Sequence, residues 1–516
     1  MPLLFSVMVI LMVLYYCIEG FGYAGYNVSA SYPFIGAALA KFLMGTGMSS
    51  ATLLTIHNSL WWLNYVILLG ALVYAPRSEH LHPLASFPNM VLKSLSPKAA
   101  LKPLNLEEGE LFGAARLQDF TWKQLLDLYA CTWCGRCQDA CPAHLSGKPL
   151  SPRELILNLK EHLLDEGLRV LEARSEVSLA NPGKAMIGDV ITEDEIWACT
   201  TCRACQEVCP VYNEHIDKIV DMRRYLVQVE AKFPEEMIPV FRNVEVYGDT
   251  FGMGQSSRLE WAHGLGVEEA SEKVQYDALL WLGCEDTFND RRMQVSRELV
   301  KILQKVGIKF AVLGRNEACC GDLARRMGNE YLFQEMVSKN IEALNKFNFK
   351  YILTMCPHCY NTLKNEYKHF GGEYEVLHYT ELFGRLFEEK KIEFVYPVGA
   401  KVIYHDPCYL GRGSEIYEPP RNILKGIKGL DLLEFGRYQK NSFCCGAGGG
   451  HKWMHEAAGT RVSDIRVEEA MEEAPDTICT TCPYCLEMFE DSVRTLGLED
   501  KIKTLDLIEV MSHAIK

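Results

Sequence analysis

The sequence predicts a multidomain chain with N-terminal transmembrane helices, a helical domain that carries two cysteine runs, and two tandem α/β domains. Three observations lead to this prediction. Two long apolar runs lie before residue 76, and two similar cysteine runs follow between residues 131 and 210. From about residue 275 onward the chain repeats one pattern of strands, helices and cysteines. With 516 residues the chain is long enough for several domains.

The first domain is expected to be a membrane anchor over residues 1–76. Residues 2–18 and 53–75 form apolar runs of 17 and 23 residues. A membrane-spanning helix needs about 20 apolar residues, with a range of about 17–25, so each run is expected to span. A signal peptide is the alternative for the first run, but the basic segment that begins such peptides is missing. Residues 34–44 are expected to form a short interfacial helix or a loop.

Basic residues are distributed unevenly around these runs. Arg77, Lys93, Lys98 and Lys102 follow the second run, whereas the segment between the runs offers only Lys41. The positive-inside rule therefore places the N-terminus and everything after residue 76 on the cytoplasmic side. We expect a multi-pass protein of the cell (inner) membrane with its soluble domains in the cytoplasm.

His57 lies within the second apolar run, shortly before Trp61, Trp62 and Asn64. Polar residues at membrane depth are costly, so His57 is a candidate to ligate a b-type haem or to line a quinone pocket. The alternative is a hydrogen bond between His57 and the other helix. A haem held by two histidines needs a second histidine within the spans, and the two runs contain none, so a quinone is favoured over a haem.

Two cysteine runs share the spacing C-x2-C-x2-C-x3-C-P, with which bacterial ferredoxins hold [4Fe-4S] cubes. The iron of a cube requires soft, anionic thiolates, and in two-cluster ferredoxins the fourth cysteine of each run binds the other cube. Structural zinc is the weaker alternative, because zinc fingers use separated C-x2-C pairs. The ligands expected for the first cube are Cys131, Cys134, Cys137 and Cys209, and those for the second are Cys199, Cys202, Cys205 and Cys141.

The chain around these runs is predicted to be helical. Residues 121–124 and 192–195 have the pattern of a capping box, and residues 151–154 place a proline at the first helical position. The cysteine runs are 57 residues apart. This arrangement resembles the α-helical ferredoxin domain of succinate-dehydrogenase-type subunits. We expect that domain over residues 119–245, after a proline-rich linker at 77–118.

Composition excludes two other classes of protein. A net charge of −14 argues against nucleic acid as a partner, because phosphate binding needs a basic face. The chain contains 20 cysteines, but disulfide-rich secreted scaffolds are usually short and lack runs of this spacing. Metal ligation in a reducing compartment is therefore expected.

The remaining chain contains two repeats, expected as α/β domains at 275–396 and 397–516. Short apolar runs such as 278–283 and 351–355 alternate with amphipathic ones, which predicts open and mostly parallel sheets. The cysteines of the two repeats are offset by 124 to 126 residues and are expected just past the strand ends. They are Cys284, Cys319, Cys320, Cys356 and Cys359 in the first repeat, and Cys408, Cys444, Cys445, Cys482 and Cys485 in the second. The glycines at 446–450 do not form a nucleotide loop and are expected to let the backbone pass close to a cluster.

The spacings C-x34-CC-x35-C-x2-C and C-x35-CC-x36-C-x2-C, each with glycine after the cysteine pair, resemble the CCG-type domains of heterodisulfide reductase catalytic subunits. The resemblance implies a non-cubane [4Fe-4S] cluster with five thiolate ligands in one or both domains. The segments HLHPL, CPHCYNTLKNEY and YHDPCYLGR are similar to those of membrane-bound iron-sulfur oxidoreductases related to the iron-sulfur subunit of electron-transfer-flavoprotein:quinone oxidoreductases. Cys479 is expected to be a buried free thiol, and Cys17 to face lipid or pack in the first span.

The resemblance implies an oxidoreductase subunit that carries electrons between a soluble flavoprotein and membrane quinone. Its expected partners are membrane lipid, quinone and an electron-transfer flavoprotein or other redox subunits. One alternative is the catalytic subunit of a heterodisulfide or disulfide reductase driven by membrane electrons. A second is a non-catalytic electron-relay subunit of a larger complex. No catalytic residue is assigned.

Overall fold

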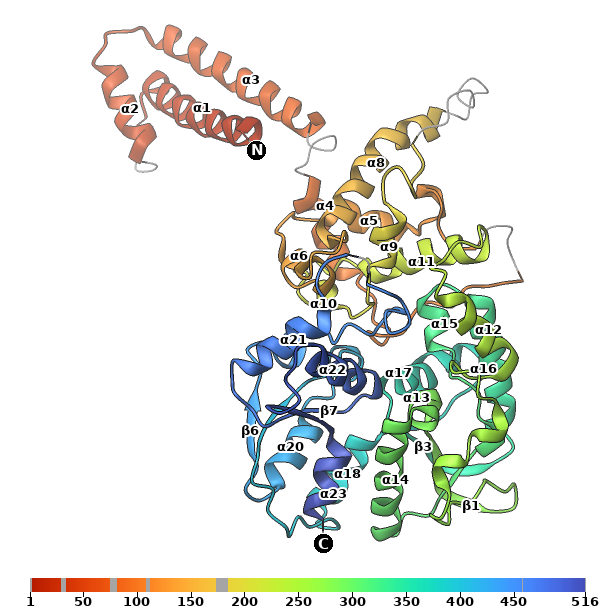
Figure 1. Ribbon diagram of the computed structural model, residues 1–516. Coiled ribbons are helices and arrows are strands. Elements are labelled where there is room, and N and C mark those ends of the chain that lie inside the picture. Colours follow the sequence, from red (N-terminus) through yellow and green to blue (C-terminus); the bar gives the residue numbers. More distant parts are fainter. Residues whose placement is uncertain are drawn as a thin grey trace. The chain divides into compact units, whose positions relative to one another are not determined.

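The computed structural model in Figure 1 describes residues 2–28, 34–74, 81–107, 112–172, 184–456 and 458–515. The chain divides into two compact units, Met1–Phe87 and Pro88–Lys516.

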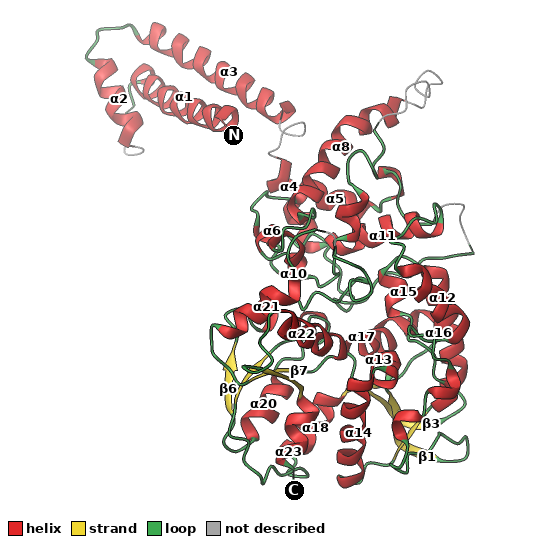
Figure 2. Cartoon of the chain, viewed as in Figure 1, coloured by secondary structure: helices red, strands yellow, loops and turns green. Residues whose placement is uncertain are grey.

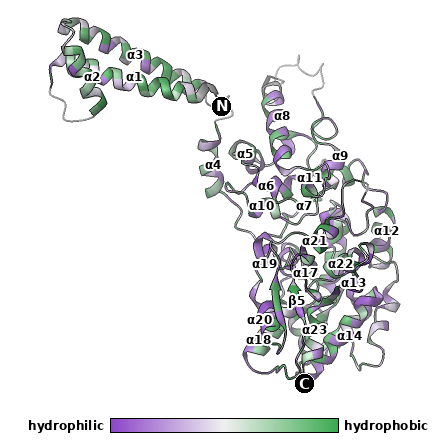
Figure 3. Cartoon of the chain, turned by 60° about the vertical axis from the view of Figure 1, so that its left-hand side comes forward, coloured by the Kyte–Doolittle hydropathy of each residue, from purple (hydrophilic) through white to green (hydrophobic). Residues whose placement is uncertain are grey.

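The first unit contains the helices α1 (Pro2–Tyr26), α2 (Phe34–Met44) and α3 (Ser50–Tyr74), and α1 packs against both others. By length and composition, α1 and α3 could each cross a membrane, over Phe5–Tyr26 and Ser50–Tyr74. In the cartoon of Figure 3, much of the length of these helices has the colour of hydrophobic residues. The two apolar helices are thus confirmed, but α1 continues past Glu19, at which the predicted 17-residue run stopped. Residues 34–44 form a helix and not a loop.

The second unit begins with a helical domain. The segment predicted as a linker contains α4 (His82–Val91). The helices that follow are α5 (Trp122–Ala130), α6 (Arg136–Asp139), α7 (Pro142–Leu145), α8 (Pro152–Glu172), α9 (Glu193–Trp197), α10 (Ala204–Glu207), α11 (His215–Gln228) and α12 (Met237–Tyr247). Both predicted capping boxes are present: Thr121 caps α5 and Thr192 caps α9. In Figure 2 the strands of the second unit lie in the part of the chain that follows these helices.

Two four-stranded parallel sheets share one topology, β2-β1-β3-β4 and β6-β5-β7-β8. The first sheet comprises β1 (Gln275–Trp281), β2 (Phe310–Val312), β3 (Asn348–Thr354) and β4 (Val376–His378). The second comprises β5 (Lys401–Tyr404), β6 (Asp431–Glu434), β7 (Thr477–Thr480) and β8 (Lys503–Asp506). In the central strand β1, residues Ala278–Trp281 are all buried, as expected for parallel strands with both faces covered. The parallel sheets predicted from the repeats are confirmed.

Helices cover both sheets. Those of the first α/β domain are α13 (Gly283–Phe288), α14 (Asp290–Lys305), α15 (Asp322–Arg326), α16 (Glu330–Leu344), α17 (Pro357–Asn361) and α18 (Tyr379–Glu388). Those of the second are α19 (Gly411–Ser414), α20 (Glu418–Gly426), α21 (Val462–Met471), α22 (Pro483–Thr495) and α23 (Leu507–Ala514).

The two α/β domains pack against each other through α14, α18, α20 and α23, whose apolar side chains form one core. A buried ion network lies in this core. Arg292 of α14 donates to Asp286 at 2.8 Å and to Asp506 at 3.0 Å, and Asp506 also caps α23. All three side chains are at most 1% exposed. Because Asp506 belongs to the second domain, this network joins the two domains.

We predict that Arg292→Met destabilises the protein by about 3–5 kcal/mol, because it leaves two buried carboxylates without their cation. Chemical denaturation of the purified protein measures the change. Lys301→Met is the matched control: Lys301 is 54% exposed and pairs with Glu298, an arrangement worth about 1 kcal/mol or less. Equal losses in the two variants would contradict the role given to Arg292.

Candidate metal centres

The first group of cysteines joins the two runs. Cys131, Cys134 and Cys137 line one small cavity together with Cys209 of the second run. Burial raises the pKa of Cys137, and together with the nearby thiols of Cys131 and Cys209 it brings that pKa to about 12. The backbone N–H of Asn213 donates to the Cys209 sulfur at 3.3 Å. The structure therefore brings together the four residues expected to hold the first cube, while iron binding stays a prediction.

The second group consists of Cys199, Cys202 and Cys205 with Cys141 of the first run. Burial raises the pKa of Cys205, and Cys141, Cys199 and Cys202 add to the shift, as does Cys137 of the first group. Burial raises the pKa of Cys199 to about 11, although the nearby Arg223 lowers it. The two groups are thus neighbours, and each contains one cysteine from the other run.

The third group follows the ends of three parallel strands. Cys284 lies in α13 after β1, Cys319 and Cys320 follow β2, and Cys356 and Cys359 begin α17 after β3. The sulfurs of Cys320 and Cys359 are 3.4 Å apart. A glycine precedes Cys284 for a steric reason: Gly283 has a φ of +72°, and a Cβ there would lie 3.0 Å from the Cys359 sulfur.

The fourth group repeats this arrangement in the second α/β domain. Cys444 and Cys445 contact each other, and Cys445 also contacts Cys485. The backbone N–H of Gly446 donates to the Cys444 sulfur at 3.4 Å, as Gly321 does to Cys319 at 3.5 Å. The remaining members of the group, Cys408 and Cys482, contact Cys444 and Cys485 respectively.

The fourth group touches the second group. Cys444 lies within hydrogen-bonding reach of both Cys408 and Cys202, and its sulfur is 3.7 Å from the hydroxyl of Thr200. Glycines make this approach possible. A Cβ at Gly448 would lie 2.2 Å from the Thr200 carbonyl oxygen, and one at Gly449 2.4 Å from that of Cys199. The glycine loop thus packs on the backbone of the second cysteine run, next to the expected cluster.

His358 lies between the third and fourth groups, and the sequence analysis missed it. Its Nδ1 is 3.9 Å from the Cys356 sulfur, and its ring also contacts Cys482. The ring packs against Tyr409 and Tyr484 at centroid distances of 4.3 and 5.0 Å. The only available signal was the sequence C-P-H-C in the first repeat against C-P-Y-C in the second.

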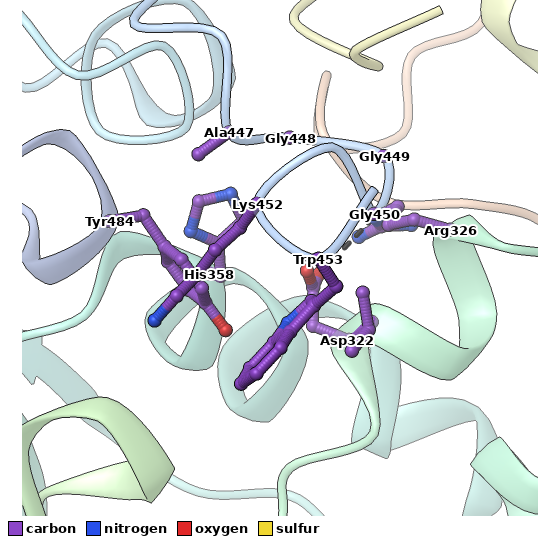
Figure 4. Close-up of a pocket in the computed structure, with 11 residues that line it drawn as sticks. Asp322, Arg326, His358, Ala447, Gly448, Gly449, Gly450, Lys452, Trp453 and Tyr484 are labelled. Atoms are coloured by element: carbon purple, nitrogen blue, oxygen red, sulfur yellow. Dashed lines mark ion pairs between the residues drawn. The ribbon is translucent and has the colours of Figure 1, made fainter. Parts of the chain in front are cut away.

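Lys452 lines the small cavity drawn in Figure 4 together with His358, Trp453 and Tyr484, and it too was missed. Its ammonium group forms ion pairs with Glu285 and Glu487 and lies 4.9 Å from the ring centre of Trp453 and 5.4 Å from that of Tyr484. Burial raises the pKa of Glu285 to about 7, although Lys452 lowers it. The cavity that remains there is about 20 Å³, which is room for about one water molecule.

In the first unit, His57 hydrogen-bonds to the neighbouring helix. Its Nδ1 lies 2.8 Å from the carbonyl oxygen of Ile18, which can only accept, so Nδ1 carries the proton. The ring packs on α1, where a Cβ at Gly22 would approach it to 3.0 Å. The structure thus shows the hydrogen bond between His57 and the other helix, and a cofactor role for His57 stays a prediction. Glu19, adjacent to Ile18, is an acidic residue within the span Phe5–Tyr26 that the sequence analysis overlooked.

Among the described residues, no group of three or more His, Cys, Asp or Glu side chains has the arrangement needed to hold a single metal ion. A [4Fe-4S] cluster differs from a single ion, because each of its irons takes its own thiolate. The donor sets consist of cysteines alone, and several sulfurs accept backbone N–H bonds, as thiolates do. The donor chemistry therefore fits iron-sulfur clusters.

Two family models match the chain. A 4Fe-4S dicluster domain matches residues 123–210, and a cysteine-rich domain of the CCG type matches residues 278–364 and 402–490. The chain is 39% identical over 516 residues to the "Probable iron-sulfur-binding oxidoreductase FadF" of Bacillus subtilis (strain 168), a match that covers 93% of this chain and 73% of that protein. It belongs to the family of CCG-domain iron-sulfur oxidoreductases.

Two further relatives represent the branches that the sequence analysis named. The "EtfAB:quinone oxidoreductase" of Syntrophomonas wolfei is 39% identical over 497 residues, which are 91% of this chain and 70% of that protein. One of the subunits of the "Dihydromethanophenazine:CoB--CoM heterodisulfide reductase" of Methanosarcina barkeri is 29% identical over 416 residues, which are 77% of this chain and 96% of that protein. The resemblance to this superfamily is confirmed, and the chain is an iron-sulfur oxidoreductase.

The exchange of cysteines between the two runs gives a testable result. We predict that Cys209→Ser removes the same cluster as Cys134→Ser, and that Cys141→Ser removes the same cluster as Cys202→Ser. Iron analysis and electron paramagnetic resonance of the anaerobically purified variants distinguish the two clusters. If Cys209→Ser instead shared its spectrum with Cys202→Ser, each run would hold its own cluster and the grouping would be wrong.

Proposed function

We propose that the protein is a membrane-anchored iron-sulfur subunit that carries electrons between a soluble flavoprotein, such as an electron-transfer flavoprotein, and membrane quinone. One observation carries the proposal: the four cysteine groups form an uninterrupted series. Cys137 approaches Cys205, Cys202 approaches Cys444, and Cys482 approaches Cys356 across His358. A series of this kind suits a conduit for electrons better than a single reaction centre.

The proposed ligands are the eighteen cysteines grouped above. The first two groups would hold cubane [4Fe-4S] clusters, and the third and fourth would hold non-cubane clusters with five thiolates each. When bound, such clusters take up and release electrons singly, whereas flavin and quinone each exchange two. The domain boundaries expected from the sequence place the cubane groups within residues 119–245 and the other two within 275–396 and 397–516.

The chain surrounds the proposed ligands with buried arginines. Arg223 lies beside Cys199, Arg258 lies 3.9 Å from the Cys284 sulfur, and Arg412 lies beside Cys202, Cys408 and Cys444. Each guanidinium offsets the negative charge of nearby thiolates in a poorly solvated interior. A nearby positive charge also favours the reduced state of a cluster, because reduction adds negative charge.

The membrane end of the proposal rests on the first unit. The two apolar helices suggest association with a membrane, and the excess of basic residues after α3 supports a cytoplasmic location for the second unit. Polar side chains within the spans, chiefly His57 and Glu19, are the candidates for the quinone site. A haem is left out of the proposal, because the two spans contain no second histidine that could serve with His57 as an axial ligand.

The disulfide-reductase alternative requires an open site at a CCG-type cluster. The space between the third and fourth groups is filled by Lys452, Trp453 and Tyr484, which leaves about 20 Å³. A disulfide substrate is much larger than the single water that such a volume admits. This favours electron transfer through the CCG-type domains over disulfide cleavage between them. It also leaves the non-catalytic relay as the second candidate, since a relay needs no substrate cavity.

The proposal predicts flavoprotein-dependent quinone reduction. Membranes containing the protein, supplied with reduced electron-transfer flavoprotein under anoxia, should reduce a short-chain quinone, and detergent-purified protein should retain this activity. Disulfide-dependent oxidation of quinol is the comparison assay, and we expect none. Brisk disulfide turnover without quinone reduction would reverse the assignment, whereas neither activity in a protein with full iron content would favour the relay.

A substitution of Cys444 tests whether electrons pass along the whole series of cysteine groups. We expect Cys444→Ala to lower the iron content and to reduce flavoprotein-dependent quinone reduction by about 100-fold or more, a barrier change of at least about 2.7 kcal/mol. Cys479→Ala is the matched control, because Cys479 is also buried in the second α/β domain but lies on β7, outside the four groups. Unchanged iron in Cys444→Ala would show that Cys444 is not a ligand.

A further inference from the structure

A separate cavity of about 550 Å³ lies beside the second cysteine run. Its walls come from residues 93–103, from the segment between Arg203 and Asp217, from His369, and from Arg412, Glu415 and Lys440 of the second α/β domain. Cavities of about 300–1,000 Å³ are typical of sites for small molecules. None of the eighteen proposed cysteine ligands lines this cavity.

The cavity is more basic than the protein as a whole. Its basic lining residues are Lys93, Lys98, Lys102, Arg203, Arg412 and Lys440, and its acidic ones are Glu207, Glu214, Asp217 and Glu415. Basic residues therefore outnumber acidic ones here, whereas in the whole chain 67 acidic residues exceed 53 basic ones. A local excess of positive charge in an acidic protein raises the local concentration of anions.

Much of the acidic lining is already neutralised. Lys98 binds Glu207 at 3.2 Å and Glu415 at 2.8 Å. Glu214 lies 3.7 Å from Lys123, which is outside the cavity, and 3.9 Å from Lys102, which lines it. Among the described residues, Arg203, Arg412 and Lys440 form no ion pair with a carboxylate. The charges of Arg203 and Lys440 therefore remain available to a bound anion, whereas the charge of Arg412 is shared with the nearby thiolates.

Arg412 is 2% exposed, yet part of its guanidinium lacks a partner. Its Nε donates to the carbonyl of Cys202 at 2.9 Å, and its Nη1 donates to the carbonyl of Ser442. Its Nη2 is buried and has no hydrogen-bond acceptor among the described residues. A buried donor without an acceptor is unusual in a native protein and calls for a partner, and Arg412 is one of the residues that line this cavity.

Arg203 occupies a backbone position that favours glycine. Its φ is +63°, and the corresponding residue of the first cysteine run is Gly135, with a φ of +80°. A non-glycine residue in the left-handed region carries strain, which commonly marks a functional side chain. Here too the guanidinium is incompletely satisfied, since Nη1 donates to Gln206 at 3.1 Å but the buried Nε has no acceptor among the residues that the structure describes.

We propose that this cavity binds a small anion through carboxylate or phosphate groups, with Arg203, Arg412 and Lys440 as its contacts. Guanidinium groups suit these anions because their planar donors match two oxygens at once. The site is coupled to the metal centres through Arg412, which lies beside Cys202, Cys408 and Cys444. An anion there offsets the arginine charge and disfavours reduction of the neighbouring centres. The inference does not depend on which donor or acceptor the protein uses.

Isothermal titration calorimetry of the anaerobically purified holoprotein tests the site, with sodium pyrophosphate and sodium citrate as probes at constant ionic strength. We expect one saturable site per chain for at least one probe. Arg203→Gly introduces the residue that the first cysteine run has at the corresponding position, Gly135. Lys440→Gln removes the charge of an exposed side chain. Each should weaken binding by about tenfold or more, as expected for the loss of a charged hydrogen bond. Lys346→Gln, outside the cavity, should bind as the unaltered protein does.

Iron content is measured for every variant, so that loss of a centre is not mistaken for loss of the anion site. If Arg203→Gly loses iron, Lys440→Gln still decides the outcome. Saturable binding that both cavity variants weaken supports the site, and competition by phosphatidylglycerol in mixed vesicles would identify the anion as a lipid headgroup. The absence of saturable heat with both probes, or equal binding by Lys440→Gln and Lys346→Gln, would overturn the proposal.

Discussion

The guanidinium of Arg223 is the interaction on which the second unit depends. It is fully buried, and among the described residues it donates only to carbonyl oxygens: those of Ile196 at 2.9 Å and Cys199 at 2.7 Å in the helical domain, of Arg326 at 3.0 Å in the first α/β domain, and of Gly449 at 3.5 Å in the second. One side chain therefore joins all three domains next to the second cysteine run. Burial lowers the pKa of Arg223 to about 10, although the nearby Cys199 raises it, so the group stays charged at neutral pH.

The junction at Arg223 sets the position of the fourth cysteine group relative to the second. Because Gly448 and Gly449 allow the loop of the second α/β domain to reach the carbonyls of Thr200 and Cys199, Cys444 comes within reach of Cys202. A side chain at either glycine would force the domains apart. The contact between two cysteine groups thus follows from backbone packing and not from the cysteines themselves.

Positive charge lies beside the second, third and fourth cysteine groups, and it has two different roles. Arg223, Arg258 and Arg412 offset the charge of thiolates, which a buried, weakly solvated site could not otherwise hold. Lys452 also occupies space: held by Glu285 and Glu487, it fills the region between the third and fourth groups. In the proposed conduit this filling keeps bulk water and substrates away from two adjacent centres.

The sequence by itself determined the chemistry and the local structure. The cysteine spacing, the capping boxes at Thr121 and Thr192, and the alternation of strands and helices all depend on residues close together in the chain, so short-range physical rules were sufficient. The pairing of Cys209 with the first run also followed, because the two-cluster motif specifies it. Only the tertiary structure decided that Cys202 meets Cys444, that His358 and Lys452 lie between the last two groups, and that Arg203 and Arg412 share a cavity. These residues are up to several hundred positions apart, and their contacts arise from the packing of whole domains. Glu19 was overlooked for a different reason: a single charge ended the apolar run in the sequence, whereas α1 continues through it to Tyr26.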